Sequence, residues 1–189
     1  MTIKWIISIT YLIFTFIIPS LGVPSNIYFL FRYSNICFLV VIIALFCSTF
    51  IHEFKKINLK QLFKSSIFAF SILFLINILN TPFSKGINPN EVNGSLFLFF
   101  FSAITYGTFL EEGIFRFCMI DPQANKKQQY ISILISSFLF SIVHGGALSI
   151  FFIGIILSFV YIKTKNIWYS IVAHGFYNTI GILIYLLSI

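Results

Sequence analysis

Long apolar stretches separated by short polar breaks constrain the fold of this chain more than any other feature. An apolar stretch of about 20 residues is long enough to cross the hydrocarbon of a bilayer as a helix, at 1.5 Å per residue. Hydropathy places such stretches at residues 3–18, 36–51, 67–79, 96–120, 131–144, 148–161 and 167–187. The sequence therefore predicts an all-α, multi-pass transmembrane helix bundle of about seven spans.

The composition excludes a soluble domain and argues against a nucleic-acid-binding protein. Hydrophobic residues make up 59% of the chain and charged residues 9%, with a mean hydropathy of +0.99, whereas soluble proteins carry about 25% charged residues. The net charge of +7 comes from basic residues in short segments between apolar runs. Lysines in such places serve as topology signals and contact anionic lipid headgroups. We therefore expect a lipid bilayer, and no nucleic acid, as a partner.

The cysteines do not form a metal or disulfide motif, and the N-terminal segment lacks the cleavage site of a signal sequence. Cys37, Cys47 and Cys118 lie in or beside apolar stretches without CxxC spacing, so they are interpreted as small apolar residues. The first apolar stretch follows Lys4 and has no small-x-small cleavage site before Pro19. It is therefore predicted to be a retained first span rather than a cleaved signal sequence.

The basic residues also predict the orientation of the chain. If the seven spans alternate in direction, two of the basic loop residues, Arg32 and Lys85, lie on one side. Nine lie on the other side: Lys4, Lys55, Lys56, Lys60, Lys64, Lys126, Lys127, Lys163 and Lys165. Cytoplasmic loops carry the positive excess, which predicts a cytoplasmic N-terminus and an external C-terminus. Within this single membrane domain, residues 1–94 are predicted to form N-terminal spans with a basic interfacial segment at 52–64, read as a helix on the cytoplasmic leaflet. Residues 95–189 are predicted to form the core that carries the chemistry.

Two adjacent carboxylates and an arginine lie inside the fourth apolar stretch. Charged side chains at that depth cost at least ~2.5–3.5 kcal/mol each, so intramembrane acids are functional candidates. On a helix Glu112 and Arg116 are four residues apart and suit an ion pair that fixes helix packing. Glu111 points about 100° away from Glu112 and is left for other chemistry.

Two histidines and an asparagine lie in later stretches, at depths that allow them to meet Glu111. His144 ends the fifth stretch, and His174 and Asn178 share one helical face in the seventh. A carboxylate in a water-poor pocket can act as a general base, and His144 could orient the same water. His174 and Asn178 could donate to a developing oxyanion. This constellation fits hydrolysis of a peptide bond.

A metal site is the alternative chemistry for the same residues. Glu111, His144 and His174 could form a three-ligand zinc site with an open water position. The chain has no H-E-x-x-H motif, so no compact motif signals zinc. We expect chemistry without a cofactor, with zinc kept as the alternative.

Three motifs on successive stretches resemble those of a known family. Glu111-Glu112-x-x-x-Arg116, Phe140-x-x-x-His144 and His174-x-x-x-Asn178 are similar to the motifs of the CPBP or Abi family. These are intramembrane endopeptidases typified by type II CAAX prenyl proteases and by bacteriocin-processing or self-immunity proteins. The resemblance covers about half of the chain, from residue 95 onward.

The resemblance implies a role for each motif residue. It implies that Glu111 and His144 activate water, that His174 and Asn178 form an oxyanion hole, and that Glu112 and Arg116 support the site. The resemblance does not decide whether the reaction requires a metal ion. All motif residues are present, so nothing marks an inactive member.

The sequence thus predicts an intramembrane protease in a cell membrane. Richness in Ile, Phe, Lys and Asn is typical of an AT-rich bacterial product, which favours a bacteriocin leader, a signalling peptide or a remnant signal peptide over a prenylated protein as substrate. The alternative is a non-catalytic bacteriocin self-immunity or membrane scaffold protein of the same fold. A proton-coupled carrier using Glu111 and His174 is disfavoured because the chain has no internal repeat.

Overall fold

Every regular element of the described chain is helical. The computed structural model describes residues 2–17, 28–79 and 96–187. The helices and π-helical segments (η) are α1 (Thr2–Leu12), η1 (Ile13–Ile17), α3 (Tyr28–Lys55), α4 (Leu59–Leu79), α5 (Leu96–Ile104), α6 (Tyr106–Glu112), η3 (Gly113–Cys118), α7 (Lys126–Val143), α8 (Leu148–Thr164) and α9 (Ile167–Leu187). The predicted all-α class is therefore confirmed, and each predicted span coincides with helical structure in the described residues.

The number of membrane crossings stays a prediction. Among the described residues, two helical segments, Tyr33–Lys55 and Ile167–Ile184, are long and apolar enough to cross a membrane by length and composition. Ile3–Thr15 and Leu148–Thr164 are shorter apolar helices. Of the polar break predicted at residues 19–35, residues 28–35 belong to α3, and residues 19–27 lie outside the described residues. The predicted break at residues 80–95, with Lys85, and residues 188–189 also lie outside the described residues.

The predicted single span at 96–120 is wrong in one respect, because the structure divides it into α5, α6 and η3. Thr105, between α5 and α6, has φ −104° and ψ −98°, which lies outside the helical region. The bend brings the chain so close to itself that a Cβ on Gly107 would lie 2.8 Å from the carbonyl oxygen of Ser102. Glycine at this position permits the bend, which hydropathy alone does not reveal.

The basic segment at 52–64 is not one interfacial helix. It comprises the end of α3 at Lys55, a turn, and the beginning of α4 at Leu59. α7 likewise begins at Lys126, five residues before its predicted apolar start, because the Asn125 side chain caps it by accepting from the Gln128 N–H. The helix α7 extends beyond its apolar stretch because Lys and Gln are good helix formers and are well solvated at a polar surface.

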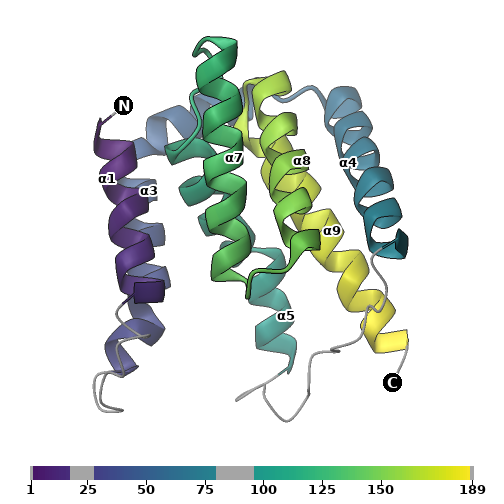
Figure 1. Cartoon of the computed structure of the whole chain (residues 1–189), viewed down its shortest axis with the longest axis horizontal. Helices are drawn as coiled ribbons and strands as arrows, with labels where there is room; N and C mark the ends of the chain where they lie inside the picture. Colours follow the sequence, from purple (N-terminus) through teal and green to yellow (C-terminus); the bar gives the residue numbers. More distant parts are fainter. Residues whose placement is uncertain (1, 18–27, 80–95, 188–189) are drawn as a thin grey trace.

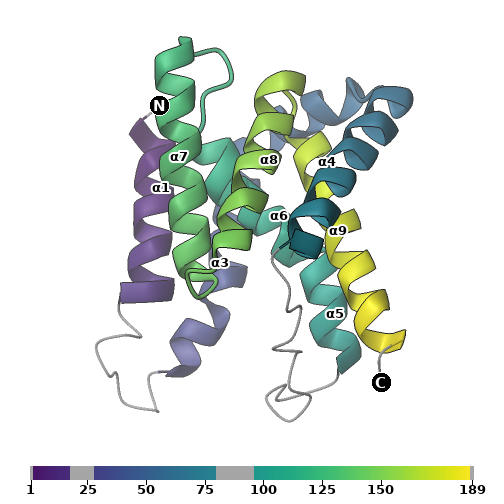
Figure 2. The same ribbon diagram turned by 45° about the vertical axis from the view of Figure 1, so that its right-hand side comes forward.

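The C-terminal helices form the centre of the molecule, and the N-terminal helices flank it. Figure 1 shows α7 and α8 side by side, with α1 and α3 on one side and α4 on the other. α4 packs against α8 and α9, an arrangement that Figure 2 shows from a second angle. α7 and α8 approach closely, since a Cβ on Gly154 would lie 2.8 Å from the Cβ of Ser137. This packing holds the two halves of the chain around α6 and η3.

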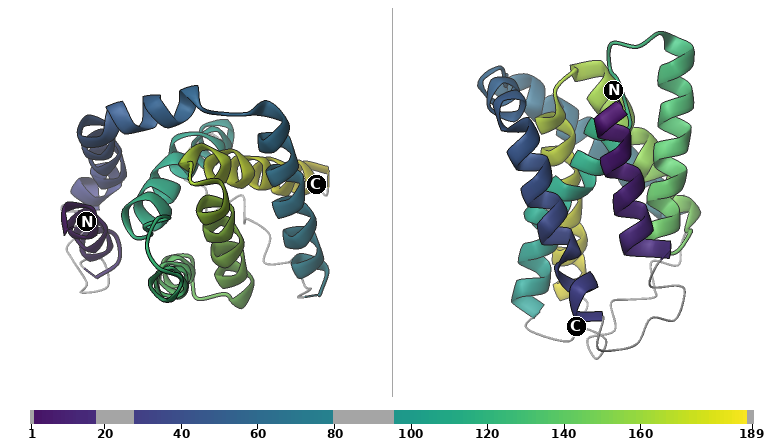
Figure 3. Two further views of the ribbon diagram at one scale, coloured as in Figure 1. Left: turned by 90° about the horizontal axis from the view of Figure 1, so that it is seen from above. Right: turned by 90° about the vertical axis from the view of Figure 1, so that its left-hand side faces the viewer.

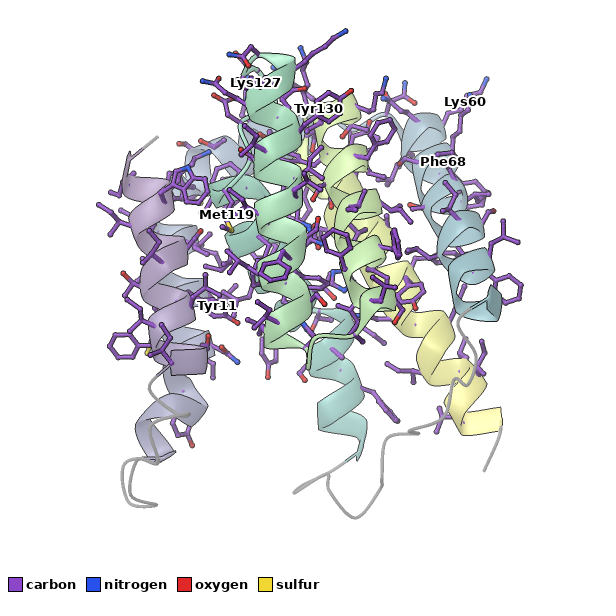
Figure 4. The ribbon with its side chains drawn as sticks, in the orientation of Figure 1. Tyr11, Lys60, Phe68, Met119, Lys127 and Tyr130 are labelled. Carbon is purple, nitrogen blue, oxygen red and sulfur yellow. The ribbon has the colours of Figure 1, made fainter. Side chains whose placement is uncertain are left out.

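The outer surface of the bundle is apolar, and lysines gather at one end. Leu134 and Phe138 on α7 are more than half exposed, at 54% and 59%, as expected where the solvent is lipid. Figure 4 shows Lys60 and Lys127 at the same end of the molecule, the end where α1 begins. α9 ends at the opposite end, as Figure 1 shows. The structure thus places these lysines as the predicted orientation requires.

We predict that Lys60→Cys and Lys127→Cys will react with a membrane-impermeant thiol reagent from the cytoplasmic side, and that a tag after Ile189 will be accessible only from outside. The reason is the nine-to-two bias of basic residues. Labelling in intact cells and in inverted vesicles measures this. Equal accessibility of the tag and of residue 127 from one side would contradict the seven-span topology.

Candidate active site

The two adjacent glutamates lie where α6 passes into η3. Glu112 ends α6, and every residue from 112 to 120 is buried. The side chain of Glu111 is 25% exposed, and that of Glu112 is fully buried. The neighbours therefore have different environments: one carboxylate is accessible, and the other needs partners inside the protein.

Arg116 is the first partner of Glu112, as the sequence predicts. Its Nη1 lies 3.4 Å from Oε1 of Glu112, and both side chains are fully buried. The guanidinium also lies over the ring of Phe140, 4.4 Å from its centroid, and Nη2 donates to the carbonyl of Gly154 (3.5 Å). The predicted i,i+4 ion pair is confirmed, and it binds η3 to α7 and α8 as well.

Helix α9 supplies two further partners of Glu112. Nδ1 of His174 lies 2.9 Å from Oε1 of Glu112, and the hydroxyl of Ser170 donates to Oε2. Ser170 is fully buried and precedes His174 by four residues, so both lie on one face of α9. Sequence reasoning did not identify Ser170, although its i,i+4 spacing from His174 is a signal that could have found it.

These contacts determine which nitrogen of the His174 ring carries a hydrogen. An ionised Glu112 can only accept hydrogen bonds, so Nδ1 of His174 must carry the hydrogen that it shares with Oε1. Nε2 of His174 then faces the other glutamate, 3.8 Å from Oε2 of Glu111. A carboxylate behind an imidazole in this way sets both its tautomer and its orientation.

His144 is oriented by the same principle, with a backbone carbonyl in place of a carboxylate. It follows the last residue of α7, and its Nδ1 lies 2.8 Å from the carbonyl oxygen of Phe140, which can only accept. Its Nε2 therefore faces Oε1 of Glu111, at 3.5 Å. Gly145 and Gly146 follow with φ of +88° and +77°, so the chain turns directly after His144.

Phe140 holds the two imidazoles and the guanidinium together. Its ring centroid lies 4.4 Å from that of His144 and 5.9 Å from that of His174, in addition to the contact with Arg116. The buried ring forms an apolar wall of the site.

Asn178 lies one turn beyond His174 but has different partners. Its Nδ2 donates to the carbonyl of Ala103 (2.9 Å) and to the hydroxyl of Thr108 (3.3 Å). Thr108 in turn donates to the same carbonyl, at 2.6 Å. Both hydrogens of the Asn178 amide are therefore engaged at the break between α5 and α6.

Glu111, His144 and His174 are the candidate ligands of a metal site. The structure brings Glu111, His144 and His174 together. Within residues 2–17, 28–79 and 96–187, however, no group of three or more His, Cys, Asp or Glu side chains is arranged so that it could hold a metal ion. In this geometry the described residues do not fit the zinc alternative.

A buried carboxylate and guanidinium beside a second carboxylate and two imidazoles, all inside an apolar helical bundle, are typical of the functional site of a membrane-embedded protein. Residues 93–180 match a known family, described as type II CAAX prenyl endopeptidase Rce1-like. The match confirms the predicted resemblance to CAAX proteases. The match supports a CAAX-type intramembrane protease function in a membrane-embedded family. Neither a curated protein nor a solved structure matches the chain.

We predict that Arg116→Ala will strongly lower the amount of folded protein in the membrane. The substitution leaves Glu112 buried without its cation, a loss that typically costs ~3–5 kcal/mol. Lys163→Ala, which removes an exposed cation, is the matched control and should accumulate normally. Membrane levels and thermal stability in detergent measure the effect. Wild-type levels and stability of Arg116→Ala would show that the pair does not support the fold.

Proposed function

We propose that this chain is an intramembrane endopeptidase that hydrolyses a peptide bond of a membrane-associated peptide or protein with water activated by Glu111 and His144. The observation that carries the proposal is the position of Glu111 between two imidazoles. Its Oε1 faces Nε2 of His144 at 3.5 Å, and its Oε2 faces Nε2 of His174 at 3.8 Å. Among these three side chains, those of Glu111 and His144 are the more exposed, at 25% and 31%, against 5% for His174.

The reaction follows from this arrangement. A water held by Glu111 and His144 gives its proton to the carboxylate of Glu111, while its oxygen bonds to the carbon of the peptide carbonyl. The carbonyl oxygen becomes an oxyanion. The proton then passes to the peptide nitrogen, the C–N bond breaks, and the products are a carboxylic acid and an amine.

We assign stabilisation of the oxyanion to His174 and Asn178. His174 donates through Nε2 when it is protonated, and the charge of its ring is then balanced by Glu112 at Nδ1. A buried carboxylate plays the same part behind the histidine of serine proteases. In this structure Asn178 donates to Ala103 and Thr108. Its use as a second donor requires that one of these hydrogen bonds be released when substrate binds.

The proposed substrate is a small peptide at the membrane of a bacterial cell, such as a bacteriocin leader, a signalling peptide or a remnant signal peptide. Lys60 and Lys127 lie at one end of the bundle (Figure 4), which supports an orientation with that end at the cytoplasmic face.

A non-catalytic immunity or scaffold role is the alternative function. Cleavage by wild type and by Glu111→Gln separates it from proteolysis.

We predict that Glu111→Gln will abolish peptide cleavage while the protein still inserts and accumulates. The amide cannot take a proton from water, and the buried pair of Glu112 and Arg116 is untouched. Cleavage of quenched-fluorescent, membrane-anchored peptides by the purified protein in proteoliposomes measures this. Lys163→Ala, which removes an exposed cation on α8, is the control and should cleave normally.

Two outcomes would contradict this proposal. Full activity of Glu111→Gln would show that Glu111 is not the general base. A wild-type protein that cleaves no peptide yet confers immunity would favour the non-catalytic alternative.

A zinc chelator should leave cleavage unchanged. Stoichiometric zinc in active enzyme, lost in both His144→Ala and His174→Ala, would replace the proposed mechanism by a metal-dependent one.

We predict that Asn178→Ala will lower kcat by about a hundredfold or more and leave KM little changed, because an oxyanion donor acts mainly in the transition state. Thr108→Val is the matched variant, since it removes the hydroxyl that also donates to the carbonyl of Ala103 and leaves the amide of Asn178 in place. Equal losses in both variants would mean that Asn178 only ties α9 to the break between α5 and α6.

A further inference from the structure

We infer that the corner joining α3 to α4 positions the Glu111–His174 pair, because it contacts both helices that carry the pair. The corner comprises residues 50–58, from the last turns of α3 to the residue before α4. It lies outside residues 93–180, the part of the chain that matches the protease family. Figure 3 (left) shows the chain crossing one edge of the bundle here, between the α3 side and the α4 side.

The corner caps the beginning of α9 from more than a hundred residues away in sequence. The first backbone N–H groups of a helix have no partner within the helix. The backbone N–H of Ile167 donates to Oε2 of Glu53 at 2.8 Å, and the side chain of Asn166 donates to the backbone carbonyl of Glu53 at 2.7 Å. Asn166 itself accepts from the N–H of Trp168 at 3.0 Å. Glu53 thus supplies a capping carboxylate that the local sequence lacks, and its charge suits a helix N-terminus.

The next two residues of α9 are bound to the corner as well. Nε1 of Trp168 donates to the carbonyl of Phe50 at 2.9 Å, and the backbone N–H of Asn58 donates to the hydroxyl of Tyr169 at 2.9 Å. Three consecutive residues in the first turn of α9 therefore each have a hydrogen bond to residues 50–58. Together they fix the depth and the rotation of this turn.

Aromatic contacts connect the same corner to α6. The ring of Phe50 lies 5.2 Å from that of Phe109, two residues before Glu111. The ring of Trp168 lies 5.7 Å from that of Phe109 and 5.1 Å from that of Phe54. Each pair is tilted or edge-on, the arrangements that aromatic pairs prefer. The corner therefore fixes the position of the turn before Glu111 relative to the beginning of α9.

The helix carries this constraint to the site. His174 lies seven residues after Ile167, about 10.5 Å along the axis and on nearly the same face. The α-helix is continuous over these two turns. A rotation or sliding of the first turn of α9 therefore moves Nε2 of His174 relative to Glu111. Glu53 is in this sense a positioning residue of the site and makes no contact with the reacting atoms.

The chain offers a readout of this inference that does not depend on proteolysis. It has three histidines, His52, His144 and His174. Selective ¹⁵N labelling of histidine in detergent micelles therefore gives three sets of imidazole signals, which His144→Gln and His174→Gln assign. The variants to compare are Glu53→Ala, which removes the cap, and Glu53→Gln, whose amide oxygen can still accept from Ile167. Asp121→Ala removes another acid, exposed and away from α9, and serves as the control.

We expect Glu53→Ala to shift the signals of His174 and to lower kcat about tenfold to a hundredfold, since a displacement of about 1 Å in an active site has effects of this size. KM should change less than kcat. Glu53→Gln should restore most of both properties, and Asp121→Ala should match wild type.

Unchanged His174 signals in folded Glu53→Ala would overturn the inference, as would a loss of stability without any change in the His174 signals. Only the kinetic part of the test rests on the proposed function. If wild type cleaves no peptide, the imidazole signals still decide whether the corner positions His174, and the two failures are distinguished. If Glu53→Ala does not fold, Trp168→Phe tests the same corner, because it removes the donor to Phe50 and keeps an aromatic ring.

Discussion

The site depends on one buried negative charge, the carboxylate of Glu112. It is fully buried and has three partners: the guanidinium of Arg116, the imidazole of His174 and the hydroxyl of Ser170. A buried carboxylate without partners costs several kcal/mol, on the order of 3–5 when one member of a pair is removed. Satisfying this charge therefore requires η3 and α9 to pack at one depth and rotation, and the same packing places His174 beside Glu111.

Helix α9 is the element on which these contacts converge. At its beginning it is capped by Glu53, in its second turn it bonds to Glu112, and further along Asn178 reaches the break between α5 and α6. A helix of known pitch held at three levels cannot slide or rotate independently. The N-terminal half of the chain, which the family match does not cover, therefore contributes to the site through the contacts of α3 with α6 and α9.

Much of the fold and part of the site could be predicted from the sequence, because these features depend on neighbours along one helix. Apolar stretches separated by polar breaks predicted the helices. The spacing of Glu112 and Arg116 predicted their ion pair, and the structure has it at 3.4 Å. The gap between the predicted stretches 131–144 and 148–161 coincides with a turn at Gly145 and Gly146, which both have positive φ.

Only the tertiary structure decided the contacts between helices. Sequence spacing does not reveal that Thr105 breaks the fourth stretch, that Ser170 bonds to Glu112, or that Glu53 caps a helix beginning at Ile167. Such contacts depend on the rotation and depth of each helix, and these are fixed when all side chains at the interfaces pack together. The sequence by itself determined that this chain forms apolar helices with carboxylates and imidazoles inside them. Packing decided which of those groups face one another, because a helix defines its own faces but not the neighbours that they meet.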